Sequence, residues 1–349
     1  MLLAAGFALL FISRLFQEFA HWYSTKVYPV WVGTTGRLMN LFPFSVSEVL
    51  LYIMIVIILL SAGVLIIKEV RRKAGKKEAC SWGMGLFLLA AFLFFLYVLN
   101  CGVNYHRESF SESSGIQVEN YTAGDLKEVC QWLTQKVNET SSEVERDQDG
   151  VMVLDIPMEK YAAEAMRSLG EDYPELAGYY PRPKGLLVPW ILSIQNLTGV
   201  YSPFTVEANY NSDMTAYNIP FTMCHELSHL KGFMQEQEAN FIAWLACSRA
   251  AAPEFRYSAA LSGWLYASNQ LWKYDPSSYE ELYGMLPENA RRDLAANDVF
   301  WAKYEGKIAE VSNQINDAYL KSNGQEQGVK SYDKMVDMLV VYVLDILAE

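Results

Sequence analysis

Hydrophobic residues are concentrated in the first third of the chain, where they form long apolar runs. Residues 47–67 and 83–103 are almost unbroken apolar sequence, and each has the length of about 20 residues that a helix needs to cross a bilayer. A third run, residues 1–22, starts apolar and carries polar side chains in its second half. We therefore predict two or three transmembrane helices, which form a membrane anchor at residues 1–103.

A short basic loop joins the two longer apolar runs. By the positive-inside rule such a loop stays in the cytoplasm, so both flanking helices lead outward. Residues 104–349 are then expected on the extracytoplasmic side of a multi-pass protein of the cell membrane. The basic residues of the loop are Lys68, Arg71, Arg72, Lys73, Lys76 and Lys77.

After residue 103 the pattern changes to the amphipathic spacing of a folded helical domain. Thr122 and Asp125 have the spacing of a capping box, and apolar residues follow at helical intervals. Helical patterns recur over residues 158–169 and 277–349, whereas residues 205–210 alternate like a short strand. The fold is therefore predicted to be mainly α, with transmembrane helices followed by a helical domain that has a short β edge element.

One segment of this domain has the spacing of a zinc site. His225 and His229 are four residues apart, so a helix directs both imidazoles to one side, with Glu226 beside them. Zinc binds such histidines, and a third protein ligand and a water complete a catalytic site. Glu226 can then act as the general base that takes a proton from the water. We predict Zn²⁺ as the cofactor.

Two glutamates compete for the third ligand position. Gly232 can end the first helix, and residues 236–245 begin a second apolar helix that returns toward the histidines. Glu236 and Glu238 are two residues apart, so they cannot share a helical face. Gln235 stands where a metzincin would have its third ligand, and an amide is a poor ligand for zinc. The spacing alone leaves Glu236 and Glu238 as alternatives.

Charge and cysteine content narrow the possible partners. The chain has 28 basic and 40 acidic residues, a formal net charge of −12, and residues 1–103 hold only 9 of the basic and 4 of the acidic ones. The acidic charge of residues 104–349 argues against nucleic acid as a partner, because nucleic-acid phosphates require clusters of Lys and Arg.

The five cysteines have no close pairs and no metal-ligand spacing, so no disulfide framework is predicted.

Several segments in order along the chain match a known pattern: residues 43–45, 102–105, 201–205, 207–211, 220–222 and 225–241. Together they resemble a bacterial membrane-protein family, domain of unknown function 3810, and the resemblance implies a zinc metallopeptidase domain of the gluzincin type. The stretch from Glu236 to Asn240 is similar to a Glu-x-x-Ala-Asn stretch of gluzincin-type membrane peptidases. That similarity implies Glu236 as the third zinc ligand and Asn240 as a residue that supports a ligand histidine.

The function expected from these features is that of a membrane-anchored zinc metallopeptidase that hydrolyses a peptide or protein substrate. Its partners would be this substrate and the lipid bilayer. Tyr210 or Tyr217 could stabilise the oxyanion, and an extended substrate could pair with the strand at residues 205–210. The alternative is a catalytically inactive receptor or scaffold with a zincin fold. Glu226 favours catalysis, because a closed structural zinc site needs no general base beside its first histidine.

Overall fold

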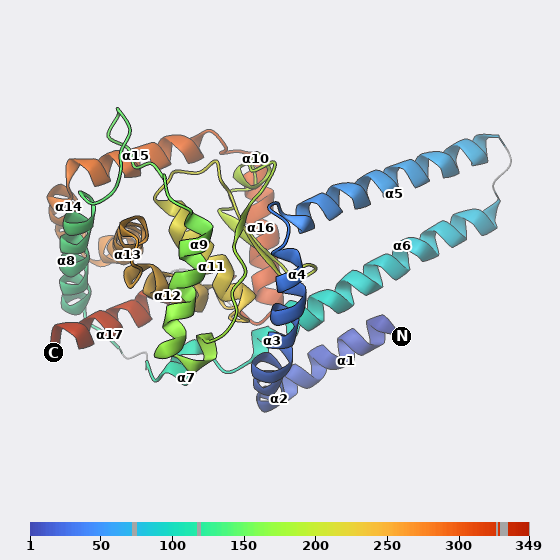
Figure 1. Cartoon of the computed structure of the whole chain (residues 1–349), viewed down its shortest axis with the longest axis horizontal. Coiled ribbons are helices and arrows are strands. Elements are labelled where there is room, and N and C mark those ends of the chain that lie inside the picture. Colours follow the sequence, from blue (N-terminus) through green and yellow to red (C-terminus); the bar gives the residue numbers. More distant parts are fainter. Residues whose placement is uncertain (72–74, 117–119, 326, 329–333, 349) are drawn as a thin grey trace.

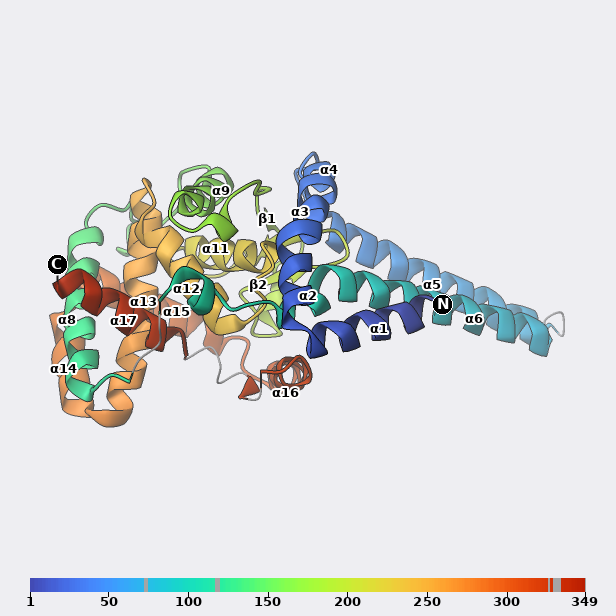
Figure 2. The ribbon, with the colours of Figure 1, turned by 90° about the horizontal axis from the view of Figure 1, so that it is seen from below.

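The computed structural model describes the whole chain except residues 72–74, 117–119, 326, 329–333 and 349. Arg72 and Lys73 of the predicted basic loop therefore lie outside the described residues. The described part consists of a helical head and an arm that projects from one side of it (Figure 1, Figure 2). The arm comprises α1 (Leu2–Leu15), α5 (Val46–Val70) and α6 (Lys76–Tyr97). The remaining described residues form the head.

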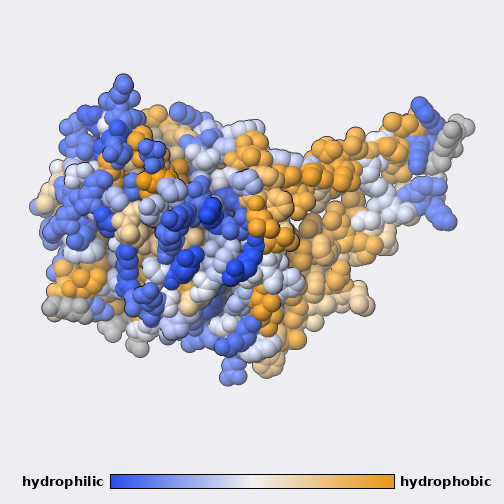
Figure 3. Space-filling model, in the orientation of Figure 1, coloured by the Kyte–Doolittle hydropathy of each residue, from blue (hydrophilic) through white to orange (hydrophobic). Residues whose placement is uncertain are grey.

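Two helices of the arm are long and apolar enough to cross a membrane. They are α5, with 25 residues, and α6, which continues through further helical turns to His106 and then has 31 residues. The space-filling view shows an apolar arm that ends in a hydrophilic tip, where α5 and α6 approach the basic loop (Figure 3). The two strong predicted spans, residues 47–67 and 83–103, are thus helical, which is consistent with a membrane protein.

The chain bends sharply near its N-terminal end. In place of one helix over residues 1–22, α1 stops at Leu15, and the next helical run, Gln17–Met39, turns away by 113°. Phe16 between them is extended, with φ −128° and ψ 90°. Ser13 Oγ hydrogen-bonds two backbone carbonyls of the preceding turn, a contact that bends helices. At about 1.5 Å per residue, α1 is shorter than a hydrocarbon core of about 30 Å.

The Gln17–Met39 run packs along the head instead of entering the arm (Figure 1). Tyr28 donates its hydroxyl proton to the carbonyl of Leu230 at 2.9 Å, and Ser24 donates to Asn104 Oδ1 at 2.8 Å. A part of the segment that the sequence analysis places within the anchor therefore forms a wall of the head. In chain order, the run contains α2 (Gln17–Trp22), α3 (Tyr28–Trp31) and α4 (Arg37–Met39), joined by π-helical turns.

The rest of the head is mainly helical around an aromatic core. Trp264 of α13 donates its indole N–H to Thr134 Oγ1 of α8 at 2.9 Å. Gly263 lets Trp244 of α12 approach closely, because a Cβ at that position would lie 2.7 Å from the Trp244 Nε1. The helices are α7 (Phe110–Ser114), α8 (Ala123–Thr140), α9 (Met158–Ser168), α10 (Trp190–Ser193), α11 (Asn218–Leu230), α12 (Glu236–Ser248), α13 (Pro253–Tyr274), α14 (Pro276–Met285), α15 (Glu288–Ala302), α16 (Lys307–Ser322) and α17 (Met335–Ala348).

The capping box predicted at the start of α8 is confirmed. The Asp125 N–H donates to Thr122 Oγ1 at 3.2 Å, and the Thr122 N–H donates to Asp125 Oδ2 at 2.7 Å. The helix predicted over residues 158–169 corresponds to α9. Both helices start where the sequence indicates. The reason is that a cap and an apolar spacing each involve residues of one helix and do not depend on the rest of the fold.

A small sheet of three strands lies beside α11, in the order β1-β3-β2. The strand predicted over residues 205–210 is β3 (Glu207–Tyr210), which pairs with β1 (Lys184–Gly185) on one side and β2 (Gly199–Ser202) on the other. Both edges of β3 are therefore occupied, and it cannot accept a substrate strand. Among the described residues, no strand pairs with the outer side of β2. This corrects the predicted role of residues 205–210, because β3 is the central strand and the edge strands of the described sheet are β1 and β2.

A buried ion pair fastens the start of α5 to this sheet. Glu207 of β3 accepts hydrogen bonds from the N–H groups of Val46 at 3.1 Å and Ser47 at 2.8 Å. The same carboxylate pairs with Lys184 Nζ at 2.6 Å. A carboxylate at this position satisfies the first N–H groups of the helix and interacts favourably with its dipole.

A second buried carboxylate also joins α5 to the head, but this one belongs to α5 and accepts hydrogen bonds from the head. Glu48 of α5 accepts hydrogen bonds from the N–H groups of Leu187 at 2.6 Å and Val188 at 2.9 Å. Its Oε1 also accepts the hydroxyl proton of Tyr52 at 2.7 Å. The arm and the head are thus joined by reciprocal polar contacts at the base of α5.

Glu207→Gln tests this attachment. The variant keeps the size of the side chain but removes the counter-charge of the buried Lys184, so the free energy of unfolding should fall by about 3–5 kcal/mol. Glu139→Gln is the matched control, because Glu139 pairs with Lys136 on the exposed surface and should contribute at most about 1 kcal/mol. Thermal unfolding of both variants in one detergent measures the difference. Equal midpoints for the two variants would contradict the role of Glu207.

Candidate metal centre

Helix α11, which carries His225 and His229, ends in a sharp turn that leads into α12. Gly232 has a φ of +97°, in the left-handed region that favours glycine. The Gly232 N–H donates to the His229 carbonyl at 2.9 Å, and the Phe233 N–H donates to the Ser228 carbonyl at 3.1 Å. These two bonds form a Schellman motif. The predicted helix end at Gly232 is confirmed, and the turn brings the start of α12 back to α11.

Glu236, the first residue of α12, lies beside both histidines of α11. Its Oε2 is 3.3 Å from His225 Nε2 and 3.5 Å from His229 Nε2. The two imidazole rings come from consecutive turns of α11, and their centroids are 4.6 Å apart. All three side chains are buried. The structure thus brings together three side chains that the sequence analysis names as zinc ligands.

The distances between these ligand atoms fit a tetrahedral zinc ion. With Zn–N and Zn–O bonds of about 2.0–2.1 Å, ligand atoms at the corners of a tetrahedron are roughly 3.4 Å apart. The two separations from Glu236 Oε2 have this size. This oxygen also makes no hydrogen bond with a described residue, although it is buried. Two imidazoles and a carboxylate are a ligand set that catalytic zinc sites use.

The two histidines differ in what lies behind them. His229 Nδ1 lies 2.9 Å from the carbonyl oxygen of Phe233, so Nδ1–H donates to this oxygen and Nε2 is left to face Glu236. Burial lowers the pKa of His225 and the neighbouring His229 acts in the same direction, whereas Glu236 and Asn240 act in the opposite direction. His225 Nδ1 itself has no hydrogen bond of good geometry in the described part of the chain.

Glu226 is enclosed between α11 and β2. Its side chain is buried, and its Oε2 makes no hydrogen bond with any residue that the structure describes. Gly199 of β2 provides the space for this side chain. A Cβ at that position would lie 2.5 Å from Glu226 Oε1 and 2.9 Å from the Asn209 carbonyl oxygen. Any larger residue at position 199 would therefore displace Glu226 or separate β2 from β3.

The ionisable groups of this site change one another's pKa values. Burial opposes ionisation of Glu236, but the two histidines outweigh it and hold its pKa well below the usual range. Burial also lowers the pKa of His229, yet the Glu236 carboxylate outweighs it and raises that pKa to about 9. Burial raises the pKa of Glu226 to about 8. Zinc binding would have to displace the proton of His229, because a ligand imidazole must be neutral.

Glu238 is directed to a different part of the head. Its Oε1 accepts the N–H of Phe110 at 2.7 Å, and burial raises its pKa to about 7. Two residues of separation rotate a side chain by more than half a turn of the helix. For this reason Glu236 and Glu238 point to opposite sides of α12, and the structure places only Glu236 with the histidines.

A cavity of about 820 Å³ opens onto the candidate metal centre, with His225, His229 and Glu236 in its lining. Its walls come from β2, α11 and α12, and also from the end of α6 and from α16. Tyr217 lines this cavity, and its hydroxyl makes no hydrogen bond with a described residue. Tyr210 is turned away and donates its hydroxyl proton to Glu159 Oε1 at 2.8 Å. Of the two tyrosines proposed for the oxyanion, only Tyr217 faces the cavity.

Residues 23–340 match the model of a family described as "Protein of unknown function (DUF3810)". The chain belongs to the DUF3810 family. No curated protein and no solved structure matches it. The matched range contains α5, α6 and the residues of the candidate metal centre, but not α1.

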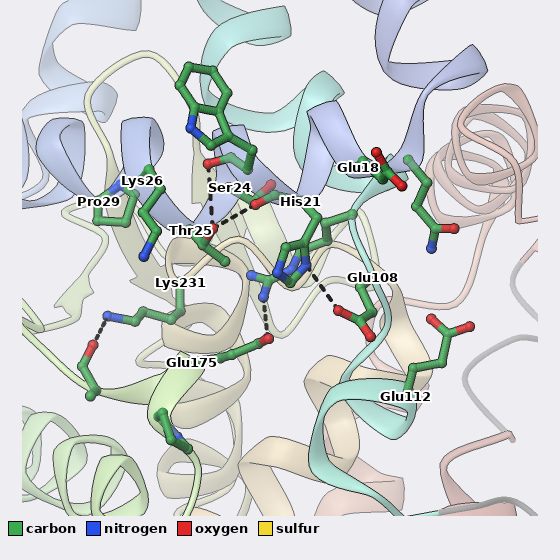
Figure 4. A pocket seen from close by; sticks show the side chains of 15 residues that line it. Glu18, His21, Ser24, Thr25, Lys26, Pro29, Glu108, Glu112, Glu175 and Lys231 are labelled. Carbon is green, nitrogen blue, oxygen red and sulfur yellow. Dashed lines mark hydrogen bonds and ion pairs between the residues drawn. The ribbon is translucent and has the colours of Figure 1, made fainter.

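This DUF3810 protein has a second group of ligand-type side chains, close to the end of α11 (Figure 4). His21 Nδ1 lies 3.2 Å from Glu108 Oε2, and Glu175 is nearby. All three are only partly buried, and Glu175 forms an ion pair with Arg107. Because Arg107 already neutralises Glu175, this group suits a metal ion less well than the buried group around Glu236.

Three features of the DUF3810 site were not found from the sequence. They are the Phe233 carbonyl behind His229, the space at Gly199, and the cavity wall at the end of α6. The first two depend on backbone position, and the third depends on contact between distant segments. For the cavity wall, the sequence offered one signal. Residues 102–105 at the end of α6 and residues 201–205 at the end of β2 both lie within the segments that resemble the family.

Zinc content of paired variants tests the assignment of the third ligand. Glu236→Gln should abolish stoichiometric zinc in the purified full-length protein, because an amide is a poor zinc ligand. Glu238→Gln is the matched control and should retain zinc, since a glutamine can still accept the Phe110 N–H. Asn240→Ala should lower zinc affinity by roughly 10–100-fold, the usual effect of losing a group that supports a ligand. Elemental analysis and a competing chelator measure all three, and zinc loss confined to Glu238→Gln would reverse the assignment.

Proposed function

We propose that this DUF3810 protein is a membrane-anchored zinc metallopeptidase. The observation that carries the proposal is the position of Glu236 Oε2 beside the Nε2 atoms of His225 and His229, with Glu226 enclosed next to them. Structural zinc sites are closed by four protein ligands. Here three ligand groups border a cavity, an arrangement that leaves room for a water and a substrate.

The side chains around the centre have distinct roles in this proposal. When bound, zinc would lower the pKa of its water to about 7 and polarise a substrate carbonyl. Glu226 would accept the proton of this water and deliver it to the leaving amine. Burial raises the pKa of Glu226 and so makes its carboxylate a stronger base. Tyr217, a residue of the cavity lining, would be the donor of a hydrogen bond to the oxyanion.

The outer edge of β2 would hold the substrate backbone. The Thr198 carbonyl accepts the Asn211 N–H at 2.8 Å. In an antiparallel pair, residues that bond the neighbouring strand alternate with residues that do not. Gly199 and Tyr201 of β2 are therefore the residues whose backbone N–H and C=O groups point away from β3. Gly199 of this edge lies against Glu226, because a Cβ there would be 2.5 Å from Glu226 Oε1. An extended peptide added at this edge would therefore run past the general base.

Hydrolysis of a fluorogenic peptide library by the zinc-loaded full-length protein in nanodiscs tests the proposal. Glu226→Gln should keep its zinc and lose about 10²–10⁴-fold in kcat, the usual contribution of a general base. Glu254→Gln, a buried glutamate of α13 outside the cavity lining, should leave kcat unchanged. Bound zinc without hydrolysis by the unaltered protein would contradict the peptidase and favour the receptor or scaffold.

Gly199→Ala separates catalysis from metal binding. The added methyl group would occupy the space of Glu226, and none of the three atoms nearest to it belongs to His225, His229 or Glu236. Because a misplacement of about 1 Å can reduce a rate by 10²-fold, kcat should fall by roughly that factor while zinc content is unchanged. Gly284→Ala is the control, since a Cβ at that position meets no atom within 4 Å. A fully active Gly199→Ala enzyme would show that Glu226 is not the base.

A further inference from the structure

Helix α16 forms one wall of the cavity and lies where the head meets the arm. It runs across the direction of α5 and α6, as the two ribbon views show (Figure 1, Figure 2). Asn313, Asn316 and Tyr319 of this helix line the cavity, and Ala309 and Leu320 are buried. These residues form the side of α16 that packs on the head and lines the cavity.

A neighbouring side of α16 exposes apolar residues. Ile308, Val311 and Ile315 have exposed fractions of 59%, 52% and 65%. Their spacing of three and four residues places them on one helical face, which we call the α16 stripe. A water-exposed row of three β-branched aliphatic residues is unfavourable, so the stripe needs a cover.

Contacts of α16 with the arm show what lies next to the stripe. Tyr319, one turn beyond Ile315, packs its ring against Tyr97 at the end of α6, with centroids 6.2 Å apart. Arg14 of α1 donates from Nη2 to the carbonyl of Ser322 at 2.9 Å. Both contacts place the end of α16 at the base of the apolar arm. The stripe therefore continues from the surface that α1 and α6 would present to lipid.

The rim of the cavity has another apolar group at the same boundary. Phe204 lines the cavity and has an exposed fraction of 45%. The preceding residue, Pro203, accepts a hydrogen bond at its carbonyl from Asn100 Nδ2 at 2.8 Å, in the helical turns that continue α6. Phe204 is therefore held close to the arm, on the loop between β2 and β3.

We propose that the α16 stripe and Phe204 rest in the interface of the lipid bilayer, so that the cavity mouth lies at the membrane surface. Aromatic and aliphatic side chains next to spanning helices favour this interface. The adjacent polar face of α16 carries Glu310, Gln314, Asp317 and Lys321 and points away from the lipid. Its acidic groups favour a zwitterionic rather than an anionic surface. The proposal does not depend on the bound metal or on peptide hydrolysis.

Spin labels on the full-length protein in phosphatidylcholine nanodiscs test this placement. Cys80, the exposed cysteine among the described residues, is first replaced by serine. Labels are then attached to Ile315→Cys, to Phe204→Cys, and to Gln314→Cys as the matched control on the adjacent polar face. Positions 315 and 204 should collide mainly with oxygen, which partitions into lipid, and position 314 mainly with a water-soluble nickel chelate.

Each outcome of the labelling decides the proposal. A shift of the oxygen-to-nickel ratio in favour of oxygen at 315 and 204, relative to 314, supports it. Nickel accessibility at 315 equal to that at 314 overturns it, because the stripe is then in water. Protection of 315 from both reagents also overturns it, because protein, such as a second copy of the chain, then covers the stripe. An unchanged elution volume of the labelled variants in size-exclusion chromatography shows that these exposed positions tolerate the label.

Discussion

A carboxylate buried in a protein interior requires nearby cations or hydrogen-bond donors, because its desolvation is costly. The nearest such groups to Glu236 are the imidazoles of His225 and His229, whose Nε2 atoms lie 3.3 and 3.5 Å from its Oε2. The requirement fixes the geometry around it. α11 must stop after His229, the chain must reverse at Gly232 through a left-handed conformation, and α12 must begin with its first residue beside the histidines. The helix hairpin and the candidate metal centre are therefore one structural unit.

The same turn also supplies support for the ligands. Reversal at Gly232 returns the Phe233 carbonyl to His229 Nδ1, which selects the tautomer whose Nε2 faces Glu236. On the opposite side, β2 encloses Glu226 through Gly199. The centre is thus held by backbone groups on two sides, and backbone groups change position less readily than side chains on a loop.

The membrane-proximal segments contribute directly to the site instead of serving only as an attachment. Tyr28 contacts the last turn of α11 at the Leu230 carbonyl, and its hydroxyl lies 2.7 Å from that of Tyr201 in β2. The end of α6 lines the cavity, and the Lys184–Glu207 pair joins α5 to the central strand. A buried pair of this kind contributes little net stability but is sensitive to the loss of either partner. The orientation of the arm and the shape of the cavity are consequently coupled.

The sequence by itself determined the features that depend on local spacing. The two long apolar helices, the start of α8 at Thr122 and the end of α11 at Gly232 are examples, because length, capping and periodicity act within one element. The sequence also placed His225, Glu226 and His229 together, since four residues make about one turn of a helix. A resemblance, and not spacing, favoured Glu236 over Glu238.

Only the tertiary structure decided how the elements meet. It turned Glu236 toward the histidines and Glu238 toward Phe110, it placed β3 in the centre of the sheet and β2 at its edge, and it bent the chain at Phe16. Spacing along a chain gives the direction of a side chain around its own helix or strand. Which neighbour lies in that direction depends on how distant segments pack, because burial and hydrogen bonding are satisfied by the whole molecule at once.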